Sequence, residues 1–163
     1  MKTNLVQERR LDKLDMKILR LLQNNGRISL TELAERVGLS TTPCTERVRR
    51  LEREGVIEGY YARLNPQAMG AQLLVFVEIK LSAKSGDIFD AFRREVRNIP
   101  EILECHLVSG EFDYLIKARL PDMSMYRKLL GEILLQLPSA KESKSYVVME
   151  EVKETLQLPI DEN

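Results

Sequence analysis

Residues 27–55 read RISLTELAERVGLSTTPCTERVRRLEREG, and this stretch decides the fold of the first part of the chain. We expect two short amphipathic helices joined by a tight turn at Gly38, because glycine alone adopts positive φ without a clash at Cβ. Ser29 caps the first helix in this interpretation, and Glu32, three positions on, completes a capping box. Ser40 caps the second helix, with Pro43 in its first turn.

The second of these helices has an apolar back and a polar front. Cys44, Val48 and Leu51 share one face at helical spacing, while hydroxyls and arginines occupy the others. A helix divided in this way, held by a partner helix across a glycine turn, suits the major groove of DNA. A plain packing unit with a solvated charged face is the alternative. The residues predicted to contact DNA are Thr41, Thr42, Thr45, Glu46, Arg47, Arg49, Arg50 and Arg53.

The chemistry of these side chains assigns them to different parts of the duplex. Base edges are expected to meet Thr42, Thr45, Glu46 and Arg49, since a carboxylate accepts from the amino group of cytosine and a guanidinium pairs with guanine. Arginine also suits bidentate contact with phosphate. Phosphate contacts are predicted for Arg47, Arg50 and Arg53, and for Arg9 and Arg10 of an N-terminal arm.

Charge is unevenly distributed although the net charge is zero. Residues 1–65 carry 13 Lys and Arg against 9 Asp and Glu, whereas the remaining residues carry 12 against 16. This modest asymmetry fits a DNA-binding module followed by one that does not bind DNA. The two cysteines lie far apart without a CxxC pair, and the N-terminus has no apolar segment. We therefore expect a cytoplasmic, nucleoid-associated protein without membrane contact.

A further helix precedes the motif. Apolar residues recur at helical spacing over 11–22, and the residues at 24–26 (NNG) end the pattern. The β-branched and aromatic residues of VIEGYYARLNP (56–66) predict a short strand pair or an extended wing. The first domain is therefore expected over 8–65 as a winged helix-turn-helix, and a change in composition places a hinge at 66–72.

The second half alternates strand and helix patterns. The patterns predict a strand over 73–81, a helix over 85–99, strands over 102–108 and 114–120 around a turn at 109–113, a helix over 123–137 and a strand over 143–152. This β-α-β-β-α-β order predicts a ferredoxin-like domain over 73–155, followed by a tail at 156–163. The whole chain is then an α+β protein.

A sheet of this kind carries both helices on one face, so its other face needs cover. Leu74, Phe76, Leu107 and Val147 predict apolar surface on that other face. A second copy of the chain is the simplest cover, and we therefore expect a homodimer.

The reactive side chains of this domain do not form a catalytic set. His106, the only histidine, neighbours Cys105 in a strand, so the two point to opposite faces. The sequence shows no metal-ligand spacing and no glycine-rich phosphate loop, and we expect no catalysis, metal or cofactor. In the turn SGEFD, Glu111 and Asp113 lie beside free amides, an arrangement able to hold an amino acid. The alternative is that Gly110 and Asp113 only make the turn.

These runs together resemble the Lrp/AsnC family of feast-or-famine transcriptional regulators over about residues 8–155. The DNA-binding half is similar through 26–55, and the amino-acid-sensing domain through LLVFVEIKL, ECHLVSGEFDYLIKARLPDMSMYRKLLGEILLQLP and SYVVMEEVKE. The resemblance implies dimers that assemble into octamers or larger rings with DNA wrapped around them, and a small amino-acid effector bound between sensing domains. It places the effector site at Leu107, Gly110, Glu111, Asp113, Leu135, Tyr146, Val147 and Val148.

We therefore predict a sequence-specific DNA-binding regulator of transcription whose assembly or DNA affinity responds to leucine or another small amino acid. Thr41, Thr45 and the tail ETLQLPIDEN differ from the leucine-responsive type within this family, so a pathway-specific regulator that senses another amino acid, such as alanine, stays open. A ligand-blind protein that wraps DNA is a second alternative. An enzyme tethered by its first half is the third.

Overall fold

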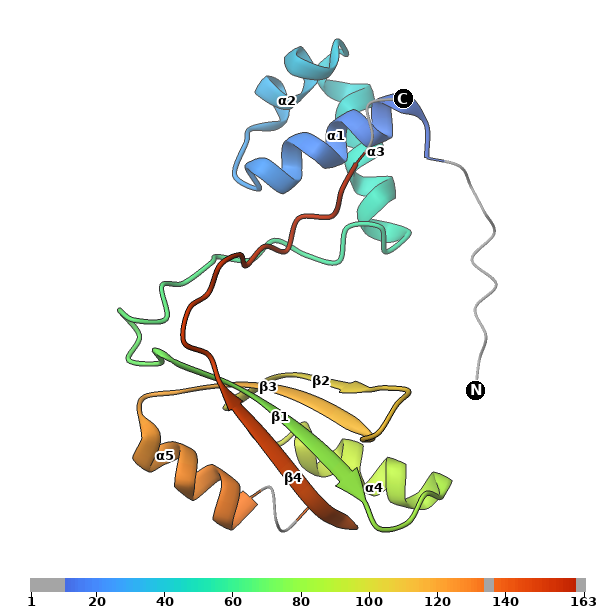
Figure 1. The fold of residues 1–163 in the computed structure, drawn as a ribbon. Coiled ribbons are helices and arrows are strands. Elements are labelled where there is room, and N and C mark those ends of the chain that lie inside the picture. Colours follow the sequence, from blue (N-terminus) through green and yellow to red (C-terminus); the bar gives the residue numbers. More distant parts are fainter. Residues whose placement is uncertain (1–10, 134–136, 161–163) are drawn as a thin grey trace. The chain divides into compact units, whose positions relative to one another are not determined.

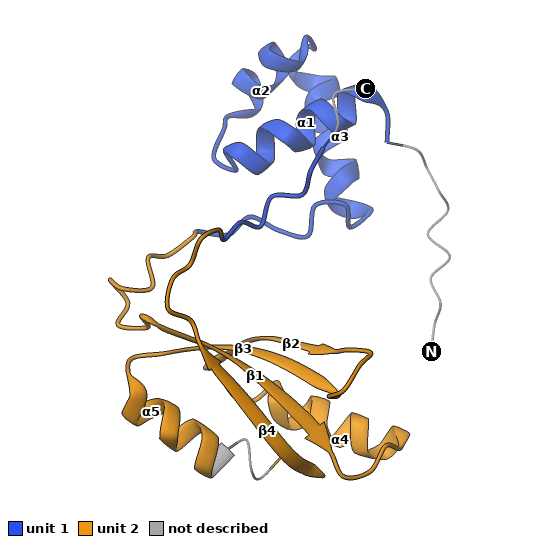
Figure 2. Cartoon of the chain, in the orientation of Figure 1, with its two compact units in different colours: residues 1–62, 154–163 blue, residues 63–153 orange. Residues whose placement is uncertain are grey.

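The computed structural model describes residues 11–133 and 137–160 of the chain (Figure 1). It divides the chain into two units, one of Met1–Ala62 with Glu154–Asn163 and one of Arg63–Lys153 (Figure 2). The tail thus groups with the first unit, whereas the sequence analysis set it apart. The domain limits expected from the sequence remain a prediction.

Three helices make up unit 1: α1 (Lys13–Asn24), α2 (Leu30–Val37) and α3 (Thr41–Arg53). Gly38 ends α2 in the left-handed region at φ 81°, as the turn requires. The core between the helices is built from the apolar stripes that the sequence predicted, namely Ile18, Leu33, Ala34, Val37, Cys44, Val48 and Leu51.

The helix caps differ in part from the expectation. The Ser29 hydroxyl accepts a hydrogen bond from the Glu32 amide at 3.1 Å and caps α2 as predicted. Ser40 occupies the cap position of α3, but its side chain makes no capping hydrogen bond, so that part of the prediction is wrong. The complete capping box lies instead on α1, where Asp12 and Asp15 each accept from the other's amide.

Residues 56–66, predicted as a strand pair or an extended wing, contain no strand. A strand needs a hydrogen-bonded partner, and this segment finds none within its own unit. The Tyr60 hydroxyl helps to anchor it, since it donates to Glu52 Oε1 on α3 at 3.0 Å. Burial, together with the nearby Glu52 carboxylate, raises the pKa of Tyr60 to about 12.

Unit 2 confirms the ferredoxin-like order. It consists of β1 (Leu73–Leu81), α4 (Gly86–Val96), β2 (Ile102–Leu107), β3 (Tyr114–Leu120), α5 (Met123–Lys128), the π-helical turn η1 (Leu129–Ile133) and β4 (Ala140–Val147). The sheet order is β2-β3-β1-β4 with every neighbouring pair antiparallel. Both α4 and α5 lie on one face of the sheet (Figure 1), where Phe92 and Tyr126 join the buried side chains of β1 and β3.

Strand β4 begins three residues earlier and ends five residues earlier than its predicted range of 143–152. Its ladder with β1 runs from Leu81, which pairs with Ala140, to Val75, which pairs with Val147. The Val148 amide still bonds the Leu74 carbonyl, and the observed strand ends at Val147. Pairing length, which local sequence does not show, decides where this strand stops.

The sheet register also corrects the predicted open face. Residues opposite one another in a ladder share a face. Val147 pairs with Val75, and Leu107 pairs with Tyr114, so both lie on the face that carries the helices. The open face keeps Leu74 and Phe76, as predicted, among charged residues of β1, β3 and β4. It is less apolar than predicted.

The tail docks on α1 within unit 1. The side-chain amide of Gln23 donates to the Leu158 carbonyl at 3.1 Å and accepts from the Leu158 amide at 2.7 Å. Gln157 adds bonds to the Gln23 carbonyl and to Asn24. This contact has no signal in the sequence, because nothing local in the tail indicates a partner far earlier in the chain.

Candidate functional site

Helix α3 presents three faces with different partners. Cys44 and its apolar neighbours face the core. Arg47 and Arg50 face the start of α1. The third face is exposed, and Thr42, Glu46 and Arg49 lie on it at helical spacing. The structure therefore splits the set of residues that the sequence had assigned to DNA.

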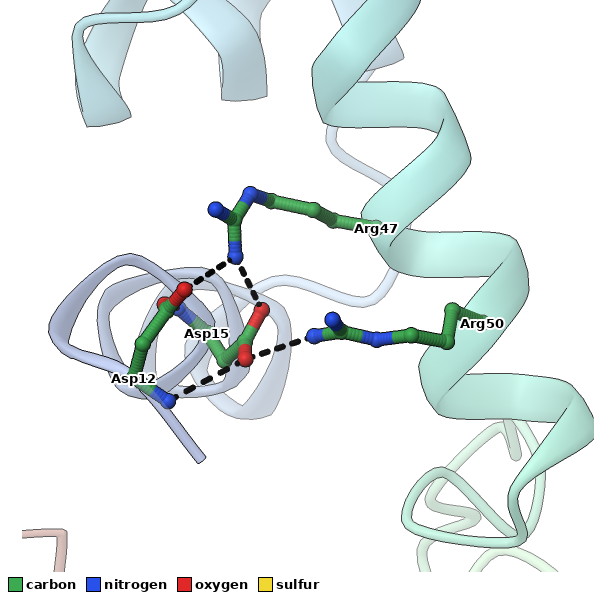
Figure 3. A network of polar contacts seen from close by, with 4 residues as sticks. All are labelled: Asp12, Asp15, Arg47 and Arg50. Carbon is green, nitrogen blue, oxygen red and sulfur yellow. Dashed lines mark hydrogen bonds and ion pairs between the residues drawn. The ribbon is translucent and has the colours of Figure 1, made fainter. Parts of the chain in front are cut away.

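Arg47 and Arg50 are held by two carboxylates of α1 (Figure 3). Arg47 Nη1 lies 2.6 Å from Asp12 Oδ2 and 2.8 Å from Asp15 Oδ1, and Arg50 Nη2 lies 2.6 Å from Asp15 Oδ2. Asp15 is 2% exposed, which is rare for a charged residue and depends on such partners. We call these four residues the clasp.

The clasp carboxylates are further stabilised by the capping box. The Asp15 amide, followed by the Arg47 guanidinium, holds the pKa of Asp12 below its ordinary value, although partial burial opposes the shift. The two carboxylates in turn raise the pKa of Arg47. Both shifts favour the charged forms of Asp12 and Arg47.

The exposed face of α3 carries the side chains best placed for a duplex. The side chains of Arg49 and Glu46 are each 66% exposed and lie 3.5 Å apart, a weak contact. Arg53 is exposed one turn further on. The Thr45 hydroxyl donates to the Thr41 carbonyl at 2.8 Å, so it bonds its own helix. The predicted arm residues Arg9 and Arg10 lie outside the described residues.

In unit 2, the SGEFD turn is built around Asp113. The Asp113 side chain accepts from the Leu81 amide at 2.8 Å and pairs with Lys84 Nζ at 2.6 Å. Burial raises the pKa of this carboxyl, but the Leu81 amide and Lys84 together hold it below its ordinary value. The Val108 amide bonds the Asp113 carbonyl, and Gly110 supplies a φ of 151°. Asp113 thus closes the turn, while Glu111 is exposed.

The other predicted effector residues lie on or after β4. The Tyr146 hydroxyl donates to Glu78 Oε1 at 3.0 Å, and Lys144 Nζ lies 5.2 Å from the centre of the Tyr146 ring. Val147 is exposed, and the Val148 amide bonds the Leu74 carbonyl at 3.0 Å. Leu107 on β2 is 53% exposed, and Leu135 lies outside the described residues.

One chain does not bring the turn and the β4 residues together as sheet neighbours. Asp113 bonds Ile79 at one end of β1, whereas Tyr146 and Val147 pair with Phe76 and Val75. That separation is about 10 Å along β1, and β3 and β4 lie on opposite sides of it. The two sets of residues therefore contact different parts of β1.

Among the described residues, no cluster of three or more His, Cys, Asp or Glu side chains forms a metal site. Burial raises the pKa of the Cys105 thiol to about 11, which keeps it protonated and a poor nucleophile. His106 contacts Glu104 at 3.2 Å on the exposed face. No helix in the described part of the chain is long and apolar enough to cross a membrane.

Sequence reasoning missed Asp12 and Asp15. Their spacing of three residues immediately before an apolar helical stripe was a signal for a capping box at α1. The ion pairs with α3 had no such signal, because their partners lie more than 30 residues away.

Comparisons with known proteins identify the family of each unit. Residues 11–58 match the family described as winged helix-turn-helix DNA-binding, and residues 74–158 match the Lrp/AsnC ligand binding domain. The leucine-responsive regulatory proteins of Escherichia coli (strain K12) and Salmonella typhimurium are each 60% identical over 150 residues, which is 92% of this chain and 92% of theirs. The chain belongs to the Lrp/AsnC family. It is a transcriptional regulator with a helix-turn-helix DNA-binding unit and an amino-acid-binding domain.

Solved structures of Lrp/AsnC regulators share the whole fold. A Neisseria meningitidis transcriptional regulator in complex with L-methionine has a TM-score of 0.88 at 38% identity, covering 93% of this chain and 98% of that one. A feast or famine regulatory protein from M. tuberculosis, also complexed with L-methionine, has a TM-score of 0.81 at 32% identity, covering 93% and 100%. The predicted fold class is thereby confirmed.

Proposed function

We propose that this Lrp/AsnC regulator reads its DNA sites with the exposed face of α3 and changes its assembly or DNA affinity when leucine or another small amino acid binds. The observation that carries the DNA part is that Thr42, Glu46 and Arg49 face solvent together on a helix with a buried back. Its similarity to leucine-responsive proteins supports leucine as the first candidate effector.

The side chains proposed to contact DNA fall into those that contact bases and those that contact phosphates. Glu46 accepts from a cytosine amino group and Arg49 pairs with guanine, as major-groove geometry allows. Arg53 contacts phosphate one turn along the helix, and Arg9 and Arg10 extend the phosphate contacts from the N-terminal arm. Thr41, Thr42 and Thr45 lie at the helix start that enters the groove first.

The assembly is a homodimer or a larger oligomer through unit 2. The open sheet face carries Leu74 and Phe76, and in the described part of unit 2 both helices lie on the other face (Figure 1); a second copy covers the open face. Two copies of α3 then meet successive major grooves at half-sites one or more helical turns apart. Sedimentation of the full chain at micromolar concentration should give a dimer or larger, and a monomer contradicts this proposal.

The effector site joins the SGEFD turn of one chain to the β4 end of another. Exposed Glu111 offers a carboxylate to the ammonium group of the ligand, and the turn amides face its carboxylate. Leu107, Val147 and Val148, with Leu135, provide apolar wall for the side chain. Asp113 supports this site by closing the turn, since its own oxygens are already bonded.

Titration calorimetry of the full chain against leucine, alanine and methionine tests the sensing part. Binding of one of them, with a shift of about 5–150-fold in DNA affinity or assembly, is the expected result, because coupling between sites is usually of that size. Methionine is included because two structural relatives bind it. No binding by any of the common amino acids would favour the ligand-blind alternative.

Binding to a selected DNA site tests the recognition part. Arg49→Ala should cost about 1–3 kcal/mol on the specific site and relax the preference at one base pair. Arg94→Ala, an exposed arginine of α4 in the other unit, is the matched control and should leave DNA binding unchanged. The regulator carries out no catalysis in this proposal and works in the cytoplasm in association with the nucleoid.

A further inference from the structure

Two of the arginines on α3 form ion pairs within the protein in the absence of DNA. The clasp brings Asp12 and Asp15 of α1 against Arg47 and Arg50 of α3 with three contacts of 2.6–2.8 Å (Figure 3). The four charges cancel within the cluster. Contacts this short are typical of charge-assisted hydrogen bonds, which are stronger than neutral ones.

The clasp carboxylates are held in place by several contacts each. Both oxygens of Asp15 are used, one by Arg47 and one by Arg50, and the residue is 2% exposed. Asp12 is fixed by the capping box on the same helix turn. A DNA phosphate that approached Arg47 would therefore also approach two fixed negative charges.

The other two arginines of the helix differ in this respect. Arg49 and Arg53 lie on the exposed face, away from the start of α1. The Arg47 and Arg50 side chains are 26% and 34% exposed, against 66% for Arg49. One helix thus carries two arginines matched by carboxylates and two directed to solvent.

We propose that Asp12 and Asp15 withhold Arg47 and Arg50 from the DNA backbone, so that the clasp positions α3 and limits sequence-independent DNA affinity. Arg47 and Arg50 are positioning residues in this scheme. Affinity for any duplex grows with each phosphate that a cation neutralises, and withholding two cations lowers that affinity for every sequence equally. The proposal rests on the DNA-binding function and specifies which arginines serve it.

The salt dependence of binding to random duplex DNA distinguishes withheld from engaged arginines. Each phosphate contact contributes about 0.9 to the slope of log affinity against log salt concentration. We expect Arg53→Gln to flatten the slope by about this amount. Arg47→Gln, the same substitution on the clasp, should leave the slope unchanged. Equal flattening by both variants would overturn the withholding.

Removal of a clasp carboxylate should make the salt dependence steeper, whereas Arg53→Gln makes it flatter. Asp12→Asn frees Arg47 from one partner on a side chain that is 49% exposed, so the fold tolerates the change. We expect stronger binding to random DNA and a slope steeper by up to about 0.9. In the double variant with Arg47→Gln, this gain should vanish. A slope equal to that of the parent in Asp12→Asn would show a purely structural clasp.

The matched control is Glu35→Gln, which removes one negative charge from an exposed residue of α2. Its slope should lie closer to that of the parent than the slope of Asp12→Asn does. An equal increase in slope in both variants would show that net charge alone causes the effect, and would overturn the proposal. Thermal melts followed by circular dichroism establish that each variant is folded. Failure of the parent to bind DNA at all would refute the function itself, whereas parental binding with equal slopes for the two arginine variants would refute only the withholding.

Discussion

Each unit of the molecule contains one buried carboxylate, and the two serve different purposes. Among the described residues, Asp15 and Asp113 are the buried carboxylate residues, at 2% and 4% exposure. Asp15 joins two helices through two arginines. Asp113 joins a turn to the end of β1 through a backbone amide, and its cationic partner Lys84 is largely exposed.

The difference shows how the partner decides what a buried charge contributes. The partners of Asp15 are side chains on the helix proposed to read DNA, so any change at Asp15 reaches that helix. The main partner of Asp113 is the Leu81 amide, which any backbone supplies, so a change there reaches only the turn and the strand end. We expect the first carboxylate to control recognition and the second to control the effector turn.

The largest effect is expected at Asp15. Asp15→Ala leaves Arg47 and Arg50 in a partly buried cluster without their main partner, and breaking a buried pair costs about 3–5 kcal/mol. We expect about 3 kcal/mol, the lower end, because both arginines retain some contact with water. Denaturant unfolding of the full chain measures it. A decrease in the free energy of unfolding of less than about 1 kcal/mol would show that the clasp contributes no more than an ordinary surface ion pair.

A smaller loss is expected at Asp113. Asp113→Ala leaves the buried Leu81 amide without an acceptor, which costs about 1–3 kcal/mol. Because the turn loses its closure, the response to amino acids should also be lost while DNA binding without effector persists. Asp113→Asn keeps an acceptor of the same size and is the control, with near-parental stability. An alanine variant that responds like the parent would exclude this turn from sensing.

The stability of the parent and that of Asp113→Asn should depend differently on pH in the acid range. The pKa of this carboxyl is lower in the folded protein than its ordinary value of 3.8. Its charge therefore stabilises the fold above that pH, and the stabilisation is lost as pH falls through the depressed folded value. The parent should lose more stability than Asp113→Asn between pH 5 and pH 2, by about 1 kcal/mol or less. Parallel curves would contradict the shift.

The smallest effect is expected at Lys84. Its side chain is 60% exposed, and exposed ion pairs contribute roughly 0–1 kcal/mol. Lys84→Met should therefore lower stability far less than Asp113→Ala does. High salt should remove the small difference in stability between Lys84→Met and the parent. If Lys84→Met cost as much as Asp113→Ala, the cation rather than the Leu81 amide would be the partner that holds the turn.

Local sequence was sufficient for the features that depend on neighbouring residues. Gly38 ends α2 because only glycine adopts its φ without cost, and Ser29 caps the same helix. The strand at Leu73–Leu81 appeared with its observed limits, since alternating apolar residues are its own signal. The helix-turn-helix and the order of strands and helices in unit 2 follow from such patterns.

Contacts between distant residues were decided only by the tertiary structure. The sequence showed four arginines on one helix, but their division into clasp and exposed face depends on where α1 packs. The face occupied by Val147 depends on its register with Val75, and a shift of one residue would reverse it. Capping, turn conformation and periodicity are set within a few residues of the chain, whereas register and ion pairing depend on partners that only folding brings together.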